Sequence, residues 1–343
     1  MFGLKKIINS LVIVPMIAAI NFATATSAEE IKAVESEHLM WRVDPQPGSI
    51  YSVYLLGSYH VGKDCLRGSG APTHIVVDLG SPALTHAFWD AETVVFEIEQ
   101  FKSSAELTQE SQQLTTKLIP RQRIPSTPAR SLKGILDERT YELLKEKTAA
   151  INFPLDDFAS LKPWVFIHAY NSFKLEKSGY KSECGLDGMI EILARALQKN
   201  TEELEDSNYA SNQYTDLFVN MDLAEIQEHI SAIIKTGFTA ELFDDYSQKI
   251  NSLIDTVNSG DSKALSSYIN NWCNEDAEQC ESLLYTRNRN WMPKIEELLH
   301  QKQDSLVVVG AGHLVGEQNL IQLLKQKGYR VRRFYNSFRL TEE

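Results

Sequence analysis

Apolar and polar residues near the start of the chain alternate as in strands, with one helix among them. Two β-rich runs, 40–43 and 50–57, are joined by a segment that contains proline and glycine, which predicts a hairpin. The Ser-Pro pair at 81–82 is typical of a helix start, and we expect this helix to end near Asp90. The run Thr93–Glu99 then has the composition of a strand. This part of the chain therefore predicts three strands and a helix.

The rest of the chain is predicted to be helical, with strands returning at the end. From about residue 101 to 301 the apolar residues have the spacing of helices. Strands are predicted over Ser305–Gly310 and Tyr329–Tyr335, separated by a helix over Glu317–Lys327 that Gly328 ends. This length is typical of a βαβ crossover, which implies at least one parallel pair. We therefore predict an α/β fold with α+β elements, in which both chain ends build a mixed central sheet around a large helical insertion.

The first residues have the features of a secretory signal. Two lysines precede an apolar run over 11–20, and small residues end at 28, which predicts a cleaved signal peptide over 1–28. The alternative is an uncleaved amino-terminal anchor. No second apolar run is long enough to span a membrane. We expect residues 29–343 to form a single periplasmic or secreted domain without a transmembrane segment.

Charge narrows the class of partner. The chain has 34 Lys and Arg against 46 Asp and Glu, a formal net charge of −12. Nucleic-acid binding needs clustered basic residues, so the expected partner is a peptide or another small molecule and not a nucleic acid. The helical insertion is a candidate lid or homodimer surface.

The four cysteines suit an oxidising compartment. Three pairings are formally available; Cys273 and Cys280 are close enough in sequence to bridge, which leaves Cys65 with Cys184. The sequence has no C-x-x-C spacing, which argues against a cysteine-ligated zinc site.

Two G-x-x-H elements each follow an apolar run. They extend from Gly57 to His60 and from Gly310 to His313, and Gly312 lies inside the second. Carboxyl ends of parallel strands meet at one edge of a sheet, where ligands usually bind, and glycine lets the backbone turn sharply there. If the two strands run the same way, the two imidazoles arrive at one edge together.

A strand carboxylate completes a candidate metal site. Glu97 and Glu99 lie on one face of their predicted strand, and burying them without partners would be costly. Two histidines and a carboxylate are a common ligand set for a hydrolytic metal. The hypothesis is a divalent ion on His60, His313 and Glu97, for which Mn²⁺, Co²⁺ and Zn²⁺ are all suitable. Glu97 is alternatively the general base.

The structural alternative is that these histidines are hydrogen-bonded loop residues. The sequence has no H-E-x-x-H segment, which excludes a helical zinc site of that type. The remaining histidines have no matching context and are interpreted as structural: His38, His74, His86, His168, His229 and His300.

Two further segments have more than one interpretation. The spacing Gly310-x-Gly312-x-x-x-Gly316 after a strand also suits a phosphate-binding loop, with Arg332 and Arg333 near a 2′-phosphate, although no second nucleotide-binding half is visible. In the helical part, Arg287 or Arg289 is a candidate for binding a substrate carboxylate or an oxyanion. The alternative for these arginines is a surface salt bridge.

Taken in order and spacing, seven short motifs resemble the TraB/GumN family, also called TraB/PrgY, which includes the animal Tiki proteins. The motifs are Trp41-Arg-Val, Tyr54-Leu-Leu-Gly-Ser-Tyr-His60-Val-Gly, Ala91-Glu-Thr-Val-Val-Phe-Glu97, Leu161-Lys-Pro-Trp164, Gly185-Leu-Asp187, Arg287-Asn288 with Trp291, and Val309-Gly-Ala-Gly-His313-Leu-Val-Gly316.

The resemblance implies a fold related to the ChaN and erythromycin-esterase group, and metal-dependent proteolysis as in Tiki members. By this resemblance, the family's paired histidines and strand glutamate correspond to His60, His313 and Glu97. The family's arginine and asparagine correspond to Arg287 and Asn288. Serine stands at position 58, where the family often has threonine, which keeps the hydroxyl.

The sequence therefore predicts an exported metal-dependent hydrolase, specifically a peptidase. Glu97, Arg287 and Asn288 are the expected catalytic residues, with Arg287 orienting the substrate and Asn288 assisting. The alternative is a periplasmic small-ligand-binding protein, or a polysaccharide or envelope assembly protein, without turnover.

Overall fold

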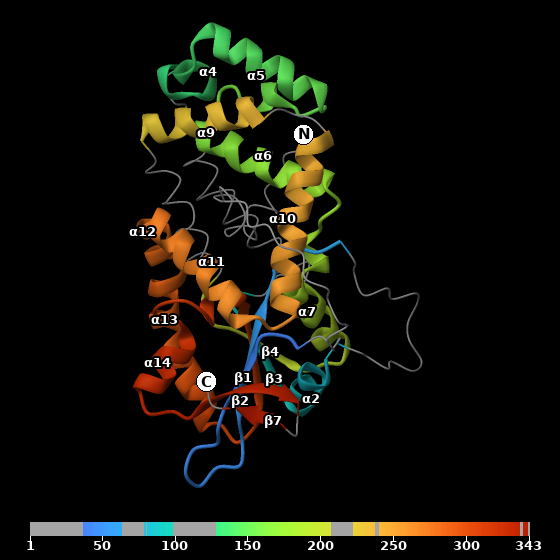
Figure 1. The fold of residues 1–343 in the computed structure, drawn as a ribbon, viewed down its shortest axis with the longest axis vertical. Helices are drawn as coiled ribbons and strands as arrows, with labels where there is room; N and C mark the ends of the chain where they lie inside the picture. Colours follow the sequence, from blue (N-terminus) through green and yellow to red (C-terminus); the bar gives the residue numbers. More distant parts are fainter. Residues whose placement is uncertain are drawn as a thin grey trace. The chain divides into compact units, whose positions relative to one another are not determined.

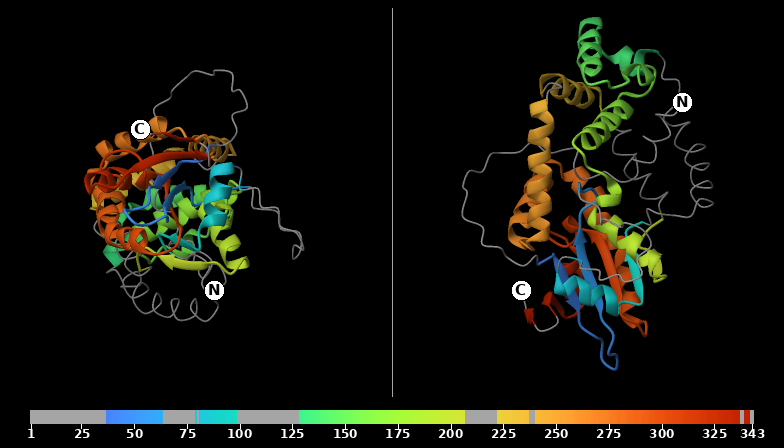
Figure 2. Two further views of the ribbon diagram at one scale, coloured as in Figure 1. Left: turned by 90° about the horizontal axis from the view of Figure 1, so that it is seen from below. Right: turned by 90° about the vertical axis from the view of Figure 1, so that its right-hand side faces the viewer.

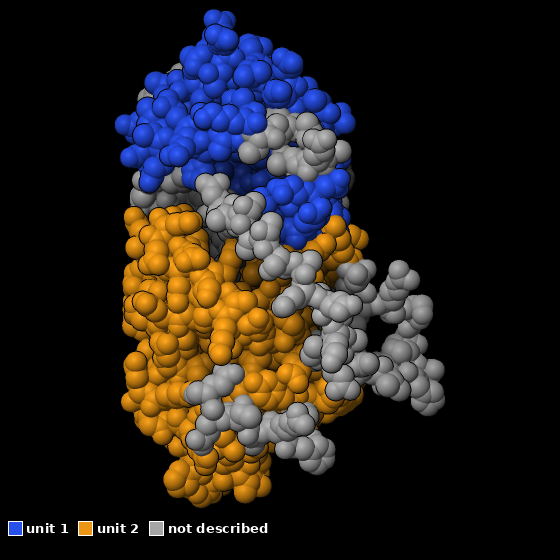
Figure 3. All heavy atoms as spheres, in the orientation of Figure 1, with its two compact units in different colours: residues 1–18, 102–180, 210–250 blue, residues 19–101, 181–209, 251–343 orange. Residues whose placement is uncertain are grey.

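The structure, a computed structural model, describes residues 37–63, 79, 81–98, 128–206, 222–236, 240–336 and 339–341. They belong to two compact units (Figure 3). The helical unit takes its described residues from segments 102–180 and 210–250, and the sheet unit from 19–101, 181–209 and 251–343. The predicted signal peptide, Cys65, His74 and Glu99 lie outside the described residues.

Within the described residues, the sheet unit contains a seven-stranded mixed sheet (Figure 1). Its strand order is β4-β3-β5-β2-β1-β6-β7. The strands β4, β3, β5 and β2 are parallel, whereas β1 is antiparallel to β2 and β6, and β7 to β6. The predicted sheet from both chain ends is therefore confirmed. The bounds are β1 Met40–Val43, β2 Val53–Ser58, β3 Thr93–Phe96, β4 Asn200–Glu203, β5 Ser305–Gly310, β6 Val331–Asn336 and β7 Arg339–Thr341.

The pairing of β2 with β5 fixes the edge at which the site lies. The register joins Val53 to Ser305 and Ser58 to Gly310, so the two strands end at the same level. Every residue of both strands is buried, as expected for central strands covered on both faces. The predicted hairpin of β1 and β2 is also present. The two G-x-x-H elements therefore leave the sheet side by side.

Strand β4 corrects the prediction that residues 101–301 contain no strand. Its sequence, Asn-Thr-Glu-Glu, has no apolar alternation, so no periodic signal marks it. It is held at the sheet edge by parallel pairing with β3, and its side chains stay exposed or half-buried. Acidic side chains on an edge strand also disfavour pairing with another chain.

Two predicted elements are shorter than expected. The strand predicted over Thr93–Glu99 ends at Phe96, and the helix predicted from Glu317 begins at Leu320. Asn319 caps this helix by accepting a hydrogen bond from the backbone N–H of Gln322. Before this helix, Gly316 and Gln318 have φ angles of 77° and 48°. These left-handed conformations are incompatible with a right-handed α-helix, so the helix cannot begin at Glu317.

Helices cover both faces of the sheet (Figures 1 and 2). Helices α2 and α7 pack on one face through apolar side chains such as Leu84, Phe88 and Ile190, and α13 and α14 lie on the other side of the sheet in Figure 1. The predicted cap of α2 is present, because the Ser81 hydroxyl accepts a hydrogen bond from the Leu84 N–H. The helices are α2 Pro82–Asp90, η3 Ser182–Cys184, α7 Leu186–Ala196, α11 Ser262–Glu275, α12 Ala277–Cys280, the π-helix η4 Glu281–Tyr285, α13 Thr286–His300, η5 Ala311–His313 and α14 Leu320–Gln326.

The helical unit has its own core. Phe153 packs on Phe158, Phe166 and Tyr170, with ring centroids between 5.3 and 6.1 Å away. Its elements are η1 Pro128–Arg130, α4 Leu132–Ile135, α5 Glu138–Ala150, η2 Leu155–Asp157, α6 Pro163–Lys177, α9 Leu223–Thr236 and α10 Ala240–Asn258, the last continuing into the sheet unit. No helix among the described residues is long and apolar enough to cross a membrane.

The predicted Cys273–Cys280 disulfide is present. It links α11 to the end of α12, directly before the π-helix η4. Cys184 is also disulfide-bonded, and its predicted partner Cys65 lies outside the described residues.

His168 makes the stability of the helical unit pH-dependent. Burial lowers the pKa of this α6 histidine to about 4, against about 6.5 in an unfolded chain. As pH falls below 6.5, the unfolded chain gains a proton that the folded protein does not, so stability is lost between pH 6.5 and 4. We expect His168→Phe to remove a loss of about 2 kcal/mol between pH 8 and 5. Denaturant unfolding followed by circular dichroism at each pH measures it. The exposed His300→Gln is the control and should keep the wild-type pH profile.

Candidate functional site

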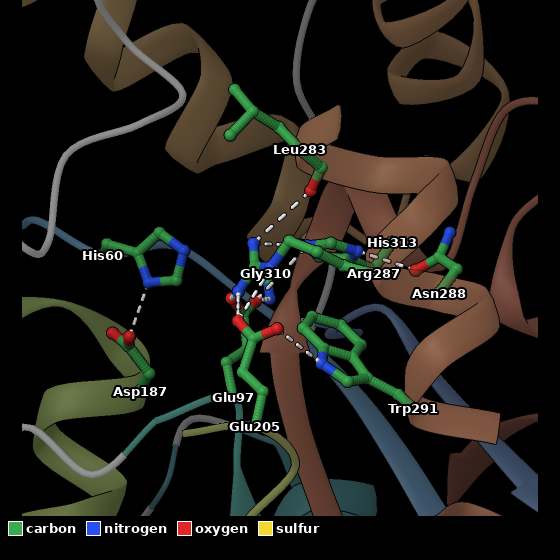
Figure 4. Close-up of polar contacts among 10 residues, drawn as sticks. All are labelled: His60, Glu97, Asp187, Glu205, Leu283, Arg287, Asn288, Trp291, Gly310 and His313. Atoms are coloured by element: carbon green, nitrogen blue, oxygen red, sulfur yellow. Dashed lines mark hydrogen bonds and ion pairs between the residues drawn. The ribbon is translucent and has the colours of Figure 1, made fainter. Parts of the chain in front are cut away.

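The candidate site lies at the carboxyl ends of the four parallel strands (Figure 4). His60 follows β2, Glu97 follows β3, and His313 follows β5. Beyond β4, backbone pairing continues to Glu205, whose N–H donates to the carbonyl of Glu97 at 3.2 Å. Four side chains from distant parts of the sequence therefore reach one edge because their strands are parallel neighbours.

Gly310 marks the point on which three of these side chains converge. A Cβ placed on Gly310 would lie 3.1 Å from His60 Nε2, 3.2 Å from Glu97 Oε1 and 3.7 Å from His313 Cδ2. The Gly310 N–H itself donates to Glu97 Oε1 at 2.5 Å. The missing side chain at this position leaves room for two imidazoles and a carboxylate.

Helix α7 orients His60. Asp187, in the first turn of α7, accepts a hydrogen bond through Oδ2 from His60 Nδ1 at 2.6 Å. Gly185 lets the helix come this close, because a Cβ there would lie 2.5 Å from the His60 carbonyl carbon. The Leu186 N–H donates to the Tyr59 carbonyl at 2.9 Å and fixes the two segments. His60 thus carries its proton on Nδ1 and turns Nε2 toward Gly310.

Helix α13 orients His313. Asn288 Oδ1 lies 2.7 Å from His313 Nδ1, while the Asn288 amide nitrogen donates to the Gln318 carbonyl at 3.0 Å. This polarity of the amide places the imidazole proton on Nδ1 and leaves His313 Nε2 as an acceptor. Nε2 lies 3.6 Å from Glu97 Oε1, and the ring packs on Trp291 with a centroid distance of 4.5 Å.

Arg287 joins two carboxylates. Its Nη2 donates to Glu97 Oε2 and to Glu205 Oε1, both at 2.5 Å, and its Nε also donates to Glu205. Nη1 lies 3.4 Å from His313 Nε2. Trp291 supports the group, because its indole N–H donates to Glu205 at 3.0 Å and its ring lies under the guanidinium. The buried positive charge of Arg287 is thus paired with the carboxylates of both Glu97 and Glu205.

These contacts set the protonation of the site. Burial opposes the charge on His60, but Asp187 overcomes it and raises the pKa of His60 to about 9. Burial lowers the pKa of His313 to about 3, so this ring is neutral. Burial would raise the pKa of Glu97, yet Arg287 and the histidines hold it well below its usual range. The pKa of Glu205 is raised, chiefly by burial, with Arg287 opposing.

Within the described residues, no group of three His, Cys, Asp or Glu side chains already has metal-site geometry. The chemistry of the donor set nevertheless fits a divalent ion. His60 presents Nε2 to the space beside Gly310, and His313 Nε2 lies 3.6 Å from the Glu97 oxygen that lines the same space. A hydrogen-bond acceptor holds Nδ1 of each ring, which is the usual support of metal-ligating histidines. Glu97 would supply the oxygen ligand.

The sequence that carries this site matches a known family. The family model described as TraB/PrgY/gumN family matches residues 39–333, most of the chain. This chain belongs to the TraB/PrgY/gumN family. A curated relative named "Metalloprotease TIKI homolog", from Amphimedon queenslandica, is 27% identical over 197 residues, which cover 50% of this chain and 37% of the relative. The chain thus spans little more than a third of that protein's length. No solved structure matches, so the expected likeness to the ChaN and erythromycin-esterase group stays a prediction.

Of the residues expected to form the site in this TraB/PrgY/gumN protein, the structure brings five together: His60, Glu97, Arg287, Asn288 and His313. Gly57 packs elsewhere, since a Cβ there would meet Leu39 and Ala311 at 3.1 Å. The roles of these residues stay predictions.

The sequence assigned no role to Asp187 or Glu205. Asp187 lies in the family motif Gly185-Leu-Asp187, and that motif was the available signal. Glu205 follows a strand without periodicity, so nothing in the sequence marks it.

The phosphate-loop alternative does not fit the structure. Its amide donors already have partners: the Gly316 N–H donates to the Ser266 hydroxyl and the Glu317 N–H to Asn270. Arg332 is paired with Asp44, and Arg333 packs against Trp41 while donating to the Gly260 carbonyl. Arg289 fits the alternative of a surface salt bridge, because it is exposed and paired with Glu281.

The Asp187 contact predicts a pH-dependent contribution to stability. Because the folded pKa of His60 is raised, the gain is fully present below pH 6.5 and is lost as pH rises through about 9. Asp187→Asn should lower the pKa of His60, measured by NMR titration, and cost on the order of 2–3 kcal/mol at pH 6 and little at pH 10. Asp90→Asn breaks the half-exposed pair of His86 with Asp90 and should change neither quantity. An unchanged His60 titration in Asp187→Asn would refute the assignment.

Proposed function

We propose that the protein is an exported metal-dependent hydrolase that cleaves amide bonds, a peptidase. His60 and His313 are its proposed metal ligands, with Glu97. One observation carries the proposal: His60 Nε2 and Glu97 Oε1 face the space beside Gly310, His313 Nε2 lies 3.6 Å from that Glu97 oxygen, and each imidazole is held at Nδ1 by an acceptor. The family membership and the metalloprotease relative support it.

The residues of the chain divide the work of such a site. A bound divalent ion, Mn²⁺, Co²⁺ or Zn²⁺, would supply a water of lowered pKa. Asp187 and Asn288 each hold a proton on Nδ1 of one ring, which leaves Nε2 as the ligand atom. His60, whose pKa is about 9, would have to lose its Nε2 proton near neutral pH to become a ligand. Glu97 is better suited to be a ligand than a general base, because a carboxylate whose pKa is held so low is a weak proton acceptor.

Arg287 is better suited to position Glu97 than to bind substrate. Both carboxylates beside it already use its Nη2 and Nε donors, so a substrate carboxylate would have to displace one of them. We therefore propose a positioning role for Arg287 in place of the substrate contact expected from the sequence.

The test uses purified wild-type protein. We expect bound divalent metal by elemental analysis, and cleavage of a peptide library in the presence of Mn²⁺, Co²⁺ or Zn²⁺ that EDTA abolishes. The proposal fails if no metal is found above background and if His60→Ala leaves any activity unchanged. Export is tested separately, by mass spectrometry of protein recovered outside the cytoplasm. The amino-terminal peptide of this protein should begin at residue 29.

A binding protein without turnover is the second candidate. It is favoured by the Arg287–Glu97 ion pair, which occupies the carboxylate and would have to adjust for Glu97 to bind an ion. A ligand that raises the melting temperature without any cleavage would favour this function.

A further inference from the structure

Ser58, the last residue of β2, carries a buried hydroxyl that the fold does not use. Ser58 is 3% exposed, and its Oγ has no hydrogen-bond partner among the described residues. Native proteins satisfy most buried polar groups, because leaving one without a partner costs free energy. Such a hydroxyl next to a candidate site is therefore available to hydrogen-bond a bound molecule.

The strand register places Ser58 beside the site. Ser58 pairs with Gly310 in the parallel ladder, so the Ser58 side chain and a Cβ on Gly310 point to the same face. On Gly310 that direction leads to His60 Nε2 and Glu97 Oε1. Because position 310 has no side chain, none from β5 stands beside the hydroxyl on this face.

Apart from His60, which is a proposed metal ligand through Nε2, the other donors of the described site are already committed. Arg287 donates to Glu97 and Glu205, the Trp291 indole to Glu205, the Asn288 amide to Gln318, and the Gly310 N–H to Glu97. The site is otherwise rich in acceptors. An incoming carbonyl oxygen therefore has no free protein donor from these four groups, and the Ser58 hydroxyl is a donor without a partner in the described structure.

We infer that Ser58 is a substrate-binding catalytic residue whose hydroxyl donates a hydrogen bond to the carbonyl oxygen of the scissile amide. The inference rests on the proposed hydrolase function. As water adds to the carbonyl carbon, the π electrons of the C=O bond move onto this oxygen, and a donor aimed at it favours the transition state. Ser58 keeps its proton throughout and forms no covalent bond with the substrate.

Ser305 provides a matched control. It is the first residue of β5, at the opposite end of the same parallel ladder. It is also fully buried, and its hydroxyl likewise has no hydrogen-bond partner among the described residues. Ser58→Ala and Ser305→Ala thus remove the same group from the same sheet, but only the first removes it at the site.

The experiment compares wild type, Ser58→Ala, Ser58→Thr and Ser305→Ala in the full chain, with metal loaded as for wild type. We expect Ser58→Ala to lower kcat about 100-fold with KM changed less than about 3-fold, and to keep wild-type metal content. Its melting temperature without metal should equal or exceed that of wild type, because an unsatisfied hydroxyl has been removed. Ser58→Thr keeps the donor and should retain most of kcat, and Ser305→Ala should retain all of it.

Different outcomes separate the two proposals. If wild type cleaves no peptide with any of the metals, the hydrolase function fails and the role of Ser58 fails with it. If wild type cleaves and Ser58→Ala is as fast, only the role of Ser58 is overturned. A Ser58→Ala protein that melts well below Ser305→Ala would show that the hydroxyl is structural, and this too overturns the inference. Should Ser58→Ala not fold, loss of kcat in Ser58→Thr beyond about 10-fold at normal metal content counts against it.

Discussion

Replacing Arg287 with alanine should destabilise the sheet unit by about 3–5 kcal/mol. The guanidinium lies between Glu97 and Glu205, whose side chains are only 10% and 5% exposed, so its removal leaves two carboxylates without their cation. A buried charge that loses its partner costs far more than the pair itself contributes, because the remaining ion cannot recover its hydration. Denaturant unfolding monitored by circular dichroism measures the loss.

Arg289 on the same helix is the matched control. It also pairs with a glutamate, Glu281, but both side chains are close to half exposed. Arg289→Ala should therefore change the free energy of unfolding by no more than about 1 kcal/mol. Equal losses in the two variants would mean that the Arg287 cluster is not the buried charge network seen in the structure. Arg287→Lys should fall between them, since one ammonium cannot replace the planar fork that reaches both carboxylates.

Replacing Gly310 with alanine should weaken metal binding and any metal-dependent activity by about 100-fold or more, while the protein stays folded. The backbone at Gly310 has φ of −52°, which alanine adopts without strain, so the effect is purely steric. The added methyl group would lie 3.1 Å from His60 Nε2 and 3.2 Å from Glu97 Oε1, and both atoms would have to move. Calorimetric titration with Mn²⁺ or Zn²⁺ measures the affinity, and thermal unfolding measures the stability.

Gly328→Ala is the control for Gly310→Ala, because it should affect stability and not metal binding. Its backbone has φ of 91°, so alanine is strained there, yet a Cβ would meet nothing within 4 Å. This variant should lose stability and keep its metal affinity. If Gly310→Ala binds metal as tightly as wild type, the space beside Gly310 is not the metal site, and the proposed ligand set is wrong.

The sequence predicted the elements that have a local signal. The cap of α2, the buried run of β5 and the two glycine-histidine elements are all local, because capping, burial and turn geometry depend on neighbouring residues. The family motifs also marked the residues that the fold brings together. The polar strand β4 was missed, since only its pairing with β3 holds it in the sheet.

By itself, the sequence determined that His60 and His313 follow buried strands and that Glu97 belongs to a third strand segment, because local pattern alone identifies these positions. Only the tertiary structure decided what surrounds them. The proton on His60 Nδ1 depends on Asp187 of α7, and the charge on Glu97 depends on Arg287 of α13. These partners are 127 and 190 residues away in the chain. Hydrogen bonding and burial act through space, so pKa values and tautomers are fixed by the order of parallel strands and the helices beside them, and not by local sequence.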